Sequence, residues 1–134
     1  MIYPQSVTYA LEALCRLART APGTYLKARE ISSELSIPEH FLGKVLTQLV
    51  RRGLLVSQKG PTGGVALSKP ALEITVQDVL QALDVGEALE DRCVLGMNNC
   101  FDRTACPFHD RWAEFKAGVV DTARNTTLAR LSES

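Results

Sequence analysis

Residues 38–68 read PEHFLGKVLTQLVRRGLLVSQKGPTGGVALS, and this stretch decides the fold. Apolar residues recur at helical spacing over its first half, which predicts a helix from about Pro38 to Arg52 that Gly53 ends. The expected inner face of this helix consists of Phe41, Leu42, Val45, Leu46 and Leu49. Two short β-rich runs follow, at 54–57 and 65–68, and the three glycines and one proline between them predict a hairpin with a mobile tip.

Two further helices are expected before this stretch. Apolar residues at helical spacing from Val7 to Ala18 predict the first helix, and Ala28, Ile31 and Leu35 mark a second, shorter one. Helix, helix, helix, hairpin is the order of a winged helix-turn-helix. In that motif one short helix braces another, which enters the major groove of DNA.

A fourth helix and a long last helix are expected after the hairpin. Thr75 and Asp78 have the spacing of a capping box at the start of the fourth helix. The last helix carries an apolar stripe that consists of Phe108, Trp112, Phe115, Val119 and Ala123. This stripe is long for a helix that only covers its own small domain, so we expect it to join two copies as a homodimer. The expected fold class is therefore mainly α with a small β hairpin: a winged helix-turn-helix plus a long C-terminal dimerisation helix.

Three parts are expected along the chain. Residues 1–84 form the winged helix-turn-helix DNA-binding domain, residues 85–106 a cysteine-containing sensor loop, and residues 107–134 the dimerisation helix and tail. No run approaches the roughly 18 apolar residues of a membrane span. The first residues lack the basic and apolar regions of a signal peptide. We therefore expect a cytoplasmic protein without a membrane partner.

The net charge of zero hides an asymmetry between the two halves of the chain. Residues 1–70 carry nine Lys or Arg and four Asp or Glu, whereas residues 71–134 carry six and eleven. No acidic residue occurs between His40 and Pro70, so the third helix and the hairpin create a local positive field. The alternative is a basic face that only meets water, but a hairpin placed directly after the helix favours a double-stranded DNA operator as partner. The residues expected to contact DNA are His40, Lys44, Thr47, Gln48, Arg51, Arg52 and Lys59.

A cluster of cysteines lies between the fourth helix and the last one. Cys93, Cys100 and Cys106 lie within fourteen residues, and His109 follows the last of them. Cys thiolates, with His replacing Cys in some centres, hold iron–sulfur clusters, and three Cys with one His also suit tetrahedral zinc. A thiol–disulfide switch without metal and three cysteines without a role remain open. Cys15 lies beside the apolar stripe of the first helix, where we expect it to pack in the core.

No enzymatic role is expected. A catalytic cysteine needs a paired base and a substrate pocket. The chain has two histidines, and His40 belongs to the expected DNA-binding helix. The regulator and enzyme classes would be separated by a test for retention on DNA.

These motifs together resemble the bacterial winged-helix regulator family that includes the iron–sulfur-biogenesis repressor IscR and the nitric-oxide sensor NsrR. The resemblance covers nearly the whole chain. It is carried by YAL at 9–11, GLL at 53–55, KGPTGGVAL at 59–67, ITVQDV at 74–79 and the three cysteines.

The resemblance implies a transcriptional regulator, described as a repressor in part of the family, that forms a homodimer through the long C-terminal helix. It also implies an iron–sulfur cluster, 2Fe–2S in preference to 4Fe–4S, that responds to iron–sulfur supply, oxygen or nitric oxide. The residues that it assigns to the cluster and its metal are Cys93, Cys100, Cys106 and His109. Two departures matter. Thr8 stands where nitric-oxide-sensing relatives carry an acidic ligand, which argues against their ligand set. Gly43 stands where the biogenesis regulator carries an acidic residue, so a shared operator is not assumed. A metal-free thiol redox-switch regulator and a zinc-binding structural protein remain the alternatives.

Overall fold

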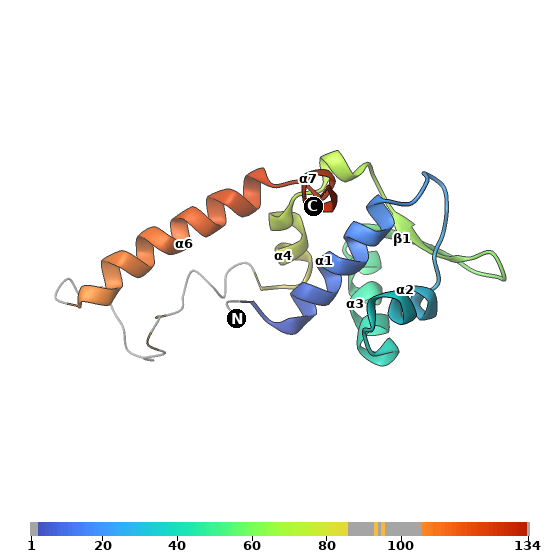
Figure 1. Ribbon diagram of the computed structural model, residues 1–134, viewed down its shortest axis with the longest axis horizontal. Helices are drawn as coiled ribbons and strands as arrows, with labels where there is room; N and C mark the ends of the chain where they lie inside the picture. Colours follow the sequence, from blue (N-terminus) through green and yellow to red (C-terminus); the bar gives the residue numbers. More distant parts are fainter. Residues whose placement is uncertain (1–2, 86–92, 94, 96–105, 134) are drawn as a thin grey trace.

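The first three helices and the hairpin form in the expected order (Figure 1). They are α1 (Gln5–Ala18), α2 (Ala28–Leu35), α3 (Glu39–Arg51), β1 (Leu55–Gln58) and β2 (Gly64–Leu67). The computed structural model describes residues 3–85, 93, 95 and 106–133. Within this part of the chain, the arrangement is that of a winged helix-turn-helix, which confirms the expected fold class.

Helical elements follow the hairpin: the short 3-10 helix η1 (Ala71–Glu73), α4 (Val76–Ala82), α6 (Pro107–Asn125) and α7 (Leu128–Ser132). The predicted capping box is present at the start of α4. The Thr75 hydroxyl accepts a hydrogen bond from the Asp78 N–H at 3.1 Å, and the Asp78 carboxylate accepts one from the Thr75 N–H at 2.9 Å. This reciprocal pair satisfies two backbone donors that the first turn leaves open.

The hairpin is anchored near its loop end to the segment between α1 and α2. β1 and β2 pair antiparallel, with Leu55 opposite Leu67. The Leu26 N–H donates to the Val65 carbonyl at 3.0 Å, and the Val65 N–H donates back at 2.8 Å. The close approach requires glycine at position 64, because φ is +140° there and a Cβ would lie 2.2 Å from the Leu26 carbonyl oxygen. We call α1 to α4 with this hairpin the head.

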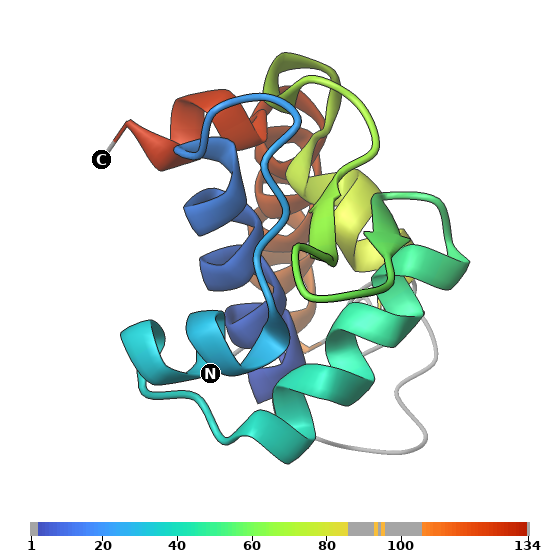
Figure 2. The ribbon, with the colours of Figure 1, turned by 90° about the vertical axis from the view of Figure 1, so that its right-hand side faces the viewer.

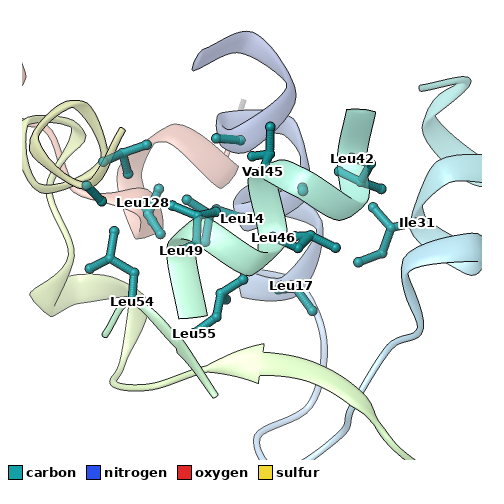
Figure 3. Packing of buried hydrophobic residues seen from close by; sticks show 14 of the residues in the cluster. Leu14, Leu17, Ile31, Leu42, Val45, Leu46, Leu49, Leu54, Leu55 and Leu128 are labelled. Carbon is teal, nitrogen blue, oxygen red and sulfur yellow. The ribbon is translucent and has the colours of Figure 1, made fainter. Parts of the chain in front are cut away.

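A hydrophobic core joins α3 to its neighbours (Figure 3). α3 contributes Leu42, Val45, Leu46 and Leu49, the spacing of a single helical face. The residues packed with this row include Leu14, Leu17, Ile31, Leu54, Leu55 and Leu128. Full burial of each leucine is worth about 1.5–3 kcal/mol relative to exposure. One face of α3 is therefore buried in the core, and the opposite face is exposed to solvent.

Phe41 does not belong to the core, so the prediction for this residue was wrong. Its side chain is 54% exposed, and its ring meets that of His40 edge-on with centroids 5.6 Å apart. Successive side chains turn by about 100° around a helix. Because the buried row begins at Leu42, Phe41 is left at the edge of the buried face.

α6 begins far from the head and runs back toward it, so that its C-terminal end meets the head (Figure 1). The Thr126 carbonyl accepts a hydrogen bond from the Val76 N–H at 2.9 Å, and the Leu128 N–H donates to the Ile74 carbonyl at 2.8 Å. Leu128 is fully buried in the core, so α7 packs on the head. Among the described residues, no helix is both long and apolar enough to cross a membrane.

Candidate DNA-binding surface and cysteine segment

One side of α3 presents a row of exposed polar side chains. His40, Lys44, Thr47 and Arg51 are exposed, and their spacing of four, three and four residues places them on the same side of the helix. The Thr47 hydroxyl donates to the Gly43 carbonyl one turn earlier at 2.8 Å. Lys and Arg side chains can donate hydrogen bonds to phosphates or to guanine, and a Thr side chain can contact bases of both A·T and G·C pairs. The row therefore has the chemistry of a surface that reads DNA.

A hollow of about 500 Å³ separates this row from the hairpin. Its lining includes Gly43, Thr47 and Arg51 from α3 and Ser57 and Val65 from the hairpin. Figure 2 shows the hairpin beside α3. A Cβ placed on Gly43 would meet nothing within 4 Å, so this side of the helix is open to a partner.

The tip of the hairpin adds a further positive charge. Lys59 is exposed there. Lys27, which sequence reasoning missed, donates through Nζ to the Gly60 carbonyl at 3.0 Å and ties the tip to the α1–α2 loop. No local pattern could have revealed this contact, because it joins residues 33 positions apart. Lys27 thus steadies the segment that carries Lys59.

Gln48 and Arg52 differ from the other expected DNA contacts because they lie against the end of α4. Gln48 Nε2 donates to the Ala82 carbonyl at 3.1 Å and lies 3.4 Å from Asp84 Oδ2. Arg52 Nη2 donates to both carboxylate oxygens of Asp84 at 2.7 Å. Arg52 Nη1 lies 3.5 Å from the Gln81 carbonyl oxygen. The structure therefore divides the polar residues of α3 into an open row and a pair that is engaged within the chain.

A second exposed ion pair joins α1 to α2 in the head. The guanidinium of Arg16 donates to the carboxylate of Glu34. This hydrogen bond lowers the pKa of the Glu34 carboxyl and raises that of the Arg16 guanidinium. Both side chains are partly open to water, so the pair resembles Arg52–Asp84 in kind but lies away from α4.

Cys15 packs in the head, as expected. Its side chain is 8% exposed, and burial raises the pKa of its thiol, while the nearby Arg19 acts in the opposite direction. A thiol held neutral in apolar surroundings is a poor nucleophile and a poor metal ligand. Cys15 is therefore separated from the cysteine cluster in chemistry as well as in sequence.

The cysteine segment, residues 93–106, and His109 hold the proposed ligands and lie only partly within the described residues. Cys93 and Cys106 are half-buried, and Cys106 directly precedes α6. His109 is half-buried, and its backbone N–H donates to the Cys106 carbonyl at 3.2 Å. Cys100 lies outside the described residues. Among residues 3–85, 93, 95 and 106–133, no three His, Cys, Asp or Glu side chains gather as metal ligands would. The four-residue ligand set thus stays a prediction.

The first part of the predicted apolar stripe of α6 lies at the surface of the single chain, whereas its last residue, Ala123, is buried against Val7 and Leu80. Phe108 and Phe115 are 52% and 49% exposed, and Trp112 stacks on Phe115 with ring centroids 5.5 Å apart. A groove of about 620 Å³ runs between this stripe and the head, with Tyr3 and Val119 among the residues that line it. An exposed aromatic stripe beside an apolar groove is typical of a protein–protein contact.

Comparison with known proteins gives relatives over almost the full chain. A family model described as Rrf2, iron-dependent transcriptional regulator, matches residues 3–134. An HTH-type transcriptional regulator of Aquifex aeolicus is 36% identical over 134 residues, which cover 98% of this chain and 91% of that protein. The HTH-type transcriptional regulator IscR of Vibrio vulnificus is 28% identical over 123 residues, which cover 92% of this chain and 74% of that protein.

Solved structures show the same fold. CymR, the global cysteine regulator of B. subtilis, matches with a TM-score of 0.79 and 21% identity over 98% of this chain and 95% of that chain. IscR of T. potens matches with a TM-score of 0.75 and 18% identity over 98% of this chain and 85% of that chain.

Proposed function

The chain belongs to the Rrf2 family of iron-dependent transcriptional regulators, and from this premise we propose that it binds a DNA operator as a homodimer and senses its signal through the cysteine segment. The family and the relatives are transcriptional regulators and not enzymes. The observation that carries the proposal is the open row of His40, Lys44, Thr47 and Arg51 beside the hairpin.

The row and the hairpin tip supply the two kinds of contact that an operator needs. Lys44, Arg51 and Lys59 are exposed cations that can neutralise phosphates and orient the head on the duplex. His40 and Thr47 lie on the same side of α3 as Lys44 and Arg51 and can reach base edges. Gln48 and Arg52 are assigned to a different role because their side chains contact Ala82 and Asp84.

A second copy of the chain is the proposed occupant of the α6 stripe. Phe108, Trp112 and Phe115 form an exposed aromatic surface on a helix that extends from the head (Figure 1). Pairing two such helices would remove this surface from water, which is the main driving force for stable association. In the helix-turn-helix geometry the helix that enters the major groove is the recognition helix, here α3. Two such helices about 34–36 Å apart read two half-sites one DNA turn apart. The operator is then a near-palindrome.

An iron–sulfur cluster is the cofactor that we propose for Cys93, Cys100, Cys106 and His109. The donor chemistry fits, because thiolates and an imidazole are the ligands that such clusters take. Cys106 and His109 are one turn apart at the start of α6, linked through a backbone hydrogen bond, so one helix end offers two donors. When bound, the cluster supplies iron that reacts with oxygen or nitric oxide. We favour 2Fe–2S over 4Fe–4S.

A thiol switch without metal is the second candidate for the sensing step. It uses the same three cysteines, and the likeness of fold to a global cysteine regulator is compatible with it. A single bound zinc ion is a further alternative. One experiment separates the three: the visible absorption spectrum of the anaerobically purified protein, with iron, sulfide and zinc counts per chain. Iron with sulfide and a coloured protein support the cluster, a colourless protein with one zinc supports the structural metal, and a colourless metal-free protein leaves the thiol switch.

A further inference from the structure

α4 ends in an arrangement that is normally made with glycine. The Asp84 N–H donates to the Gln81 carbonyl at 3.1 Å, and the Val85 N–H donates to the Leu80 carbonyl at 3.0 Å. These two bonds form a Schellman motif, in which the residue after the C-cap takes the left-handed conformation. Asp84 takes it with φ at +59°. Glycine adopts this conformation without steric cost and aspartate only occasionally, which raises the question of a role for the aspartate side chain outside the helix end.

The carboxylate of Asp84 offers such a role, because it faces the recognition helix. Both of its oxygens accept from Arg52, and Oδ2 also lies 3.4 Å from Gln48 Nε2. Since Gln48 lies in the last turn of α3 and Arg52 is the residue directly after it, the contact holds the C-terminal end of that helix. Glycine would make the same turn but would leave both side chains without this acceptor.

Val85, the next residue along the chain, contacts other elements than Asp84 does. Val85 packs against the small cluster of Val7, Leu80 and Ala123, and Ala123 belongs to α6. Two consecutive residues therefore connect the recognition helix to the packing beneath α6. The chain then continues toward Cys93, eight positions further on. The backbone at 84–85 is thus tied both to Arg52 and to the packing beneath α6.

A simple contribution to stability is the competing explanation for the ion pair. The side chains of Arg52 and Asp84 are 42% and 63% exposed. Ion pairs that are this open to water stabilise folded proteins little, because solvent screens the attraction. The pair is therefore too weak to account for a left-handed aspartate through stability alone.

We infer that Asp84 is a positioning residue that couples the cysteine segment to the recognition helix through Arg52 and Gln48. The inference rests on the proposed function. In one state of the cysteine segment the backbone at 84–85 presents the carboxylate to α3, and in the other the contact is weakened. Operator affinity changes between the two states because α3 is held in the first and less constrained in the second.

The test compares operator affinity between two states of each variant. The operator is the tightest duplex selected from a random library. The two states are the apo protein and the protein reconstituted anaerobically with ferrous iron and sulfide. Asp84→Asn is the main variant, since asparagine also tolerates the left-handed conformation. Arg52→Gln is the partner variant. Glu34→Gln is the matched control, because it breaks an exposed Arg–carboxylate pair away from α4.

In wild type we expect the operator dissociation constants of the apo and the reconstituted protein to differ. In Asp84→Asn their ratio should be about two- to fivefold closer to one, the range set by an exposed ion pair. Arg52→Gln should give the same loss, the double variant should lose no more than either alone, and Glu34→Gln should keep the wild-type ratio. A wild-type ratio in Asp84→Asn, or an equal loss in the control, overturns the coupling role.

The wild-type protein distinguishes a failure of cluster sensing from a failure of the coupling role of Asp84. If its ratio is one, sensing by the cluster fails, and the coupling role fails with it. If its ratio departs from one, sensing stands, and the variants alone decide the role of Asp84. Urea unfolding of each variant checks the fold. If Asp84→Asn is unstable, Asp84→Gly keeps the turn, removes the carboxylate and should give the same loss.

Discussion

Replacing Lys59 by alanine removes a positive charge from the hairpin tip and leaves the core untouched, because the side chain is exposed. On the proposed surface each chain offers three open cations, Lys44, Arg51 and Lys59, whereas Arg52 is held by Asp84. Three from each of two copies neutralise about six phosphates, so the slope of log affinity against log salt should be about −5. Lys59→Ala removes one cation from each copy and should flatten that slope by about 2.

The assay is fluorescence anisotropy of a labelled operator duplex at several salt concentrations. Between about 50 and 200 mM salt, the flatter slope means that the variant loses roughly tenfold less affinity than the wild type does. Arg130→Ala is the control. Arg130 is 81% exposed on α7, which Figure 2 shows at the opposite corner of the molecule from α3. An unchanged slope in Lys59→Ala, or the same change in the control, would refute the assignment of this surface to DNA.

Three further predictions follow from the packing and the ligand chemistry. Leu49→Ala should lower the free energy of unfolding by about 2–5 kcal/mol in urea titration, because Leu49 is fully buried on α3; a loss below 1 kcal/mol would contradict the assigned core. Phe115→Glu should convert the dimer to a monomer in sedimentation at micromolar concentration, while Leu72→Glu, at an even more exposed apolar position on η1, should not; a wild-type monomer would rule out the dimer. Cys100→Ala should abolish the visible absorption of the anaerobic protein, whereas Cys15→Ala should keep it because that thiol is buried in the head; an unchanged spectrum in Cys100→Ala would exclude it as a ligand.

Local patterns predicted the elements that were confirmed. The capping box at Thr75 and Asp78 depends on residues three positions apart, and the helical spacing of Leu42, Val45 and Leu49 spans two turns. Such signals need no knowledge of the rest of the fold. Phe41 shows their limit. An apolar residue beside a buried row is ambiguous in sequence, because burial at the edge of a helix face depends on what packs there.

Some of the proposed functional residues follow from local sequence patterns, and others depend on the tertiary structure. His40, Lys44, Thr47 and Arg51 form a row that follows from helical spacing alone once the buried face of α3 is known. The ligand set depends on how Cys93, Cys100 and Cys106 approach His109. Chain spacing restricts that approach but does not decide it, because the approach depends on contacts between distant parts of the chain.

The sequence by itself determined the order of the elements, the family and the basic, acid-free surface of the third helix and hairpin, because helix periodicity, turn glycines and charge are properties of neighbouring residues. Only the tertiary structure decided that Gln48 and Arg52 turn to the end of α4 and that Leu128 returns to the core. The contacts of Gln48 and Arg52 join residues 34 and 32 positions apart. No local pattern encodes such a contact, since it exists only when packing of the apolar faces has already brought α3 and α4 side by side.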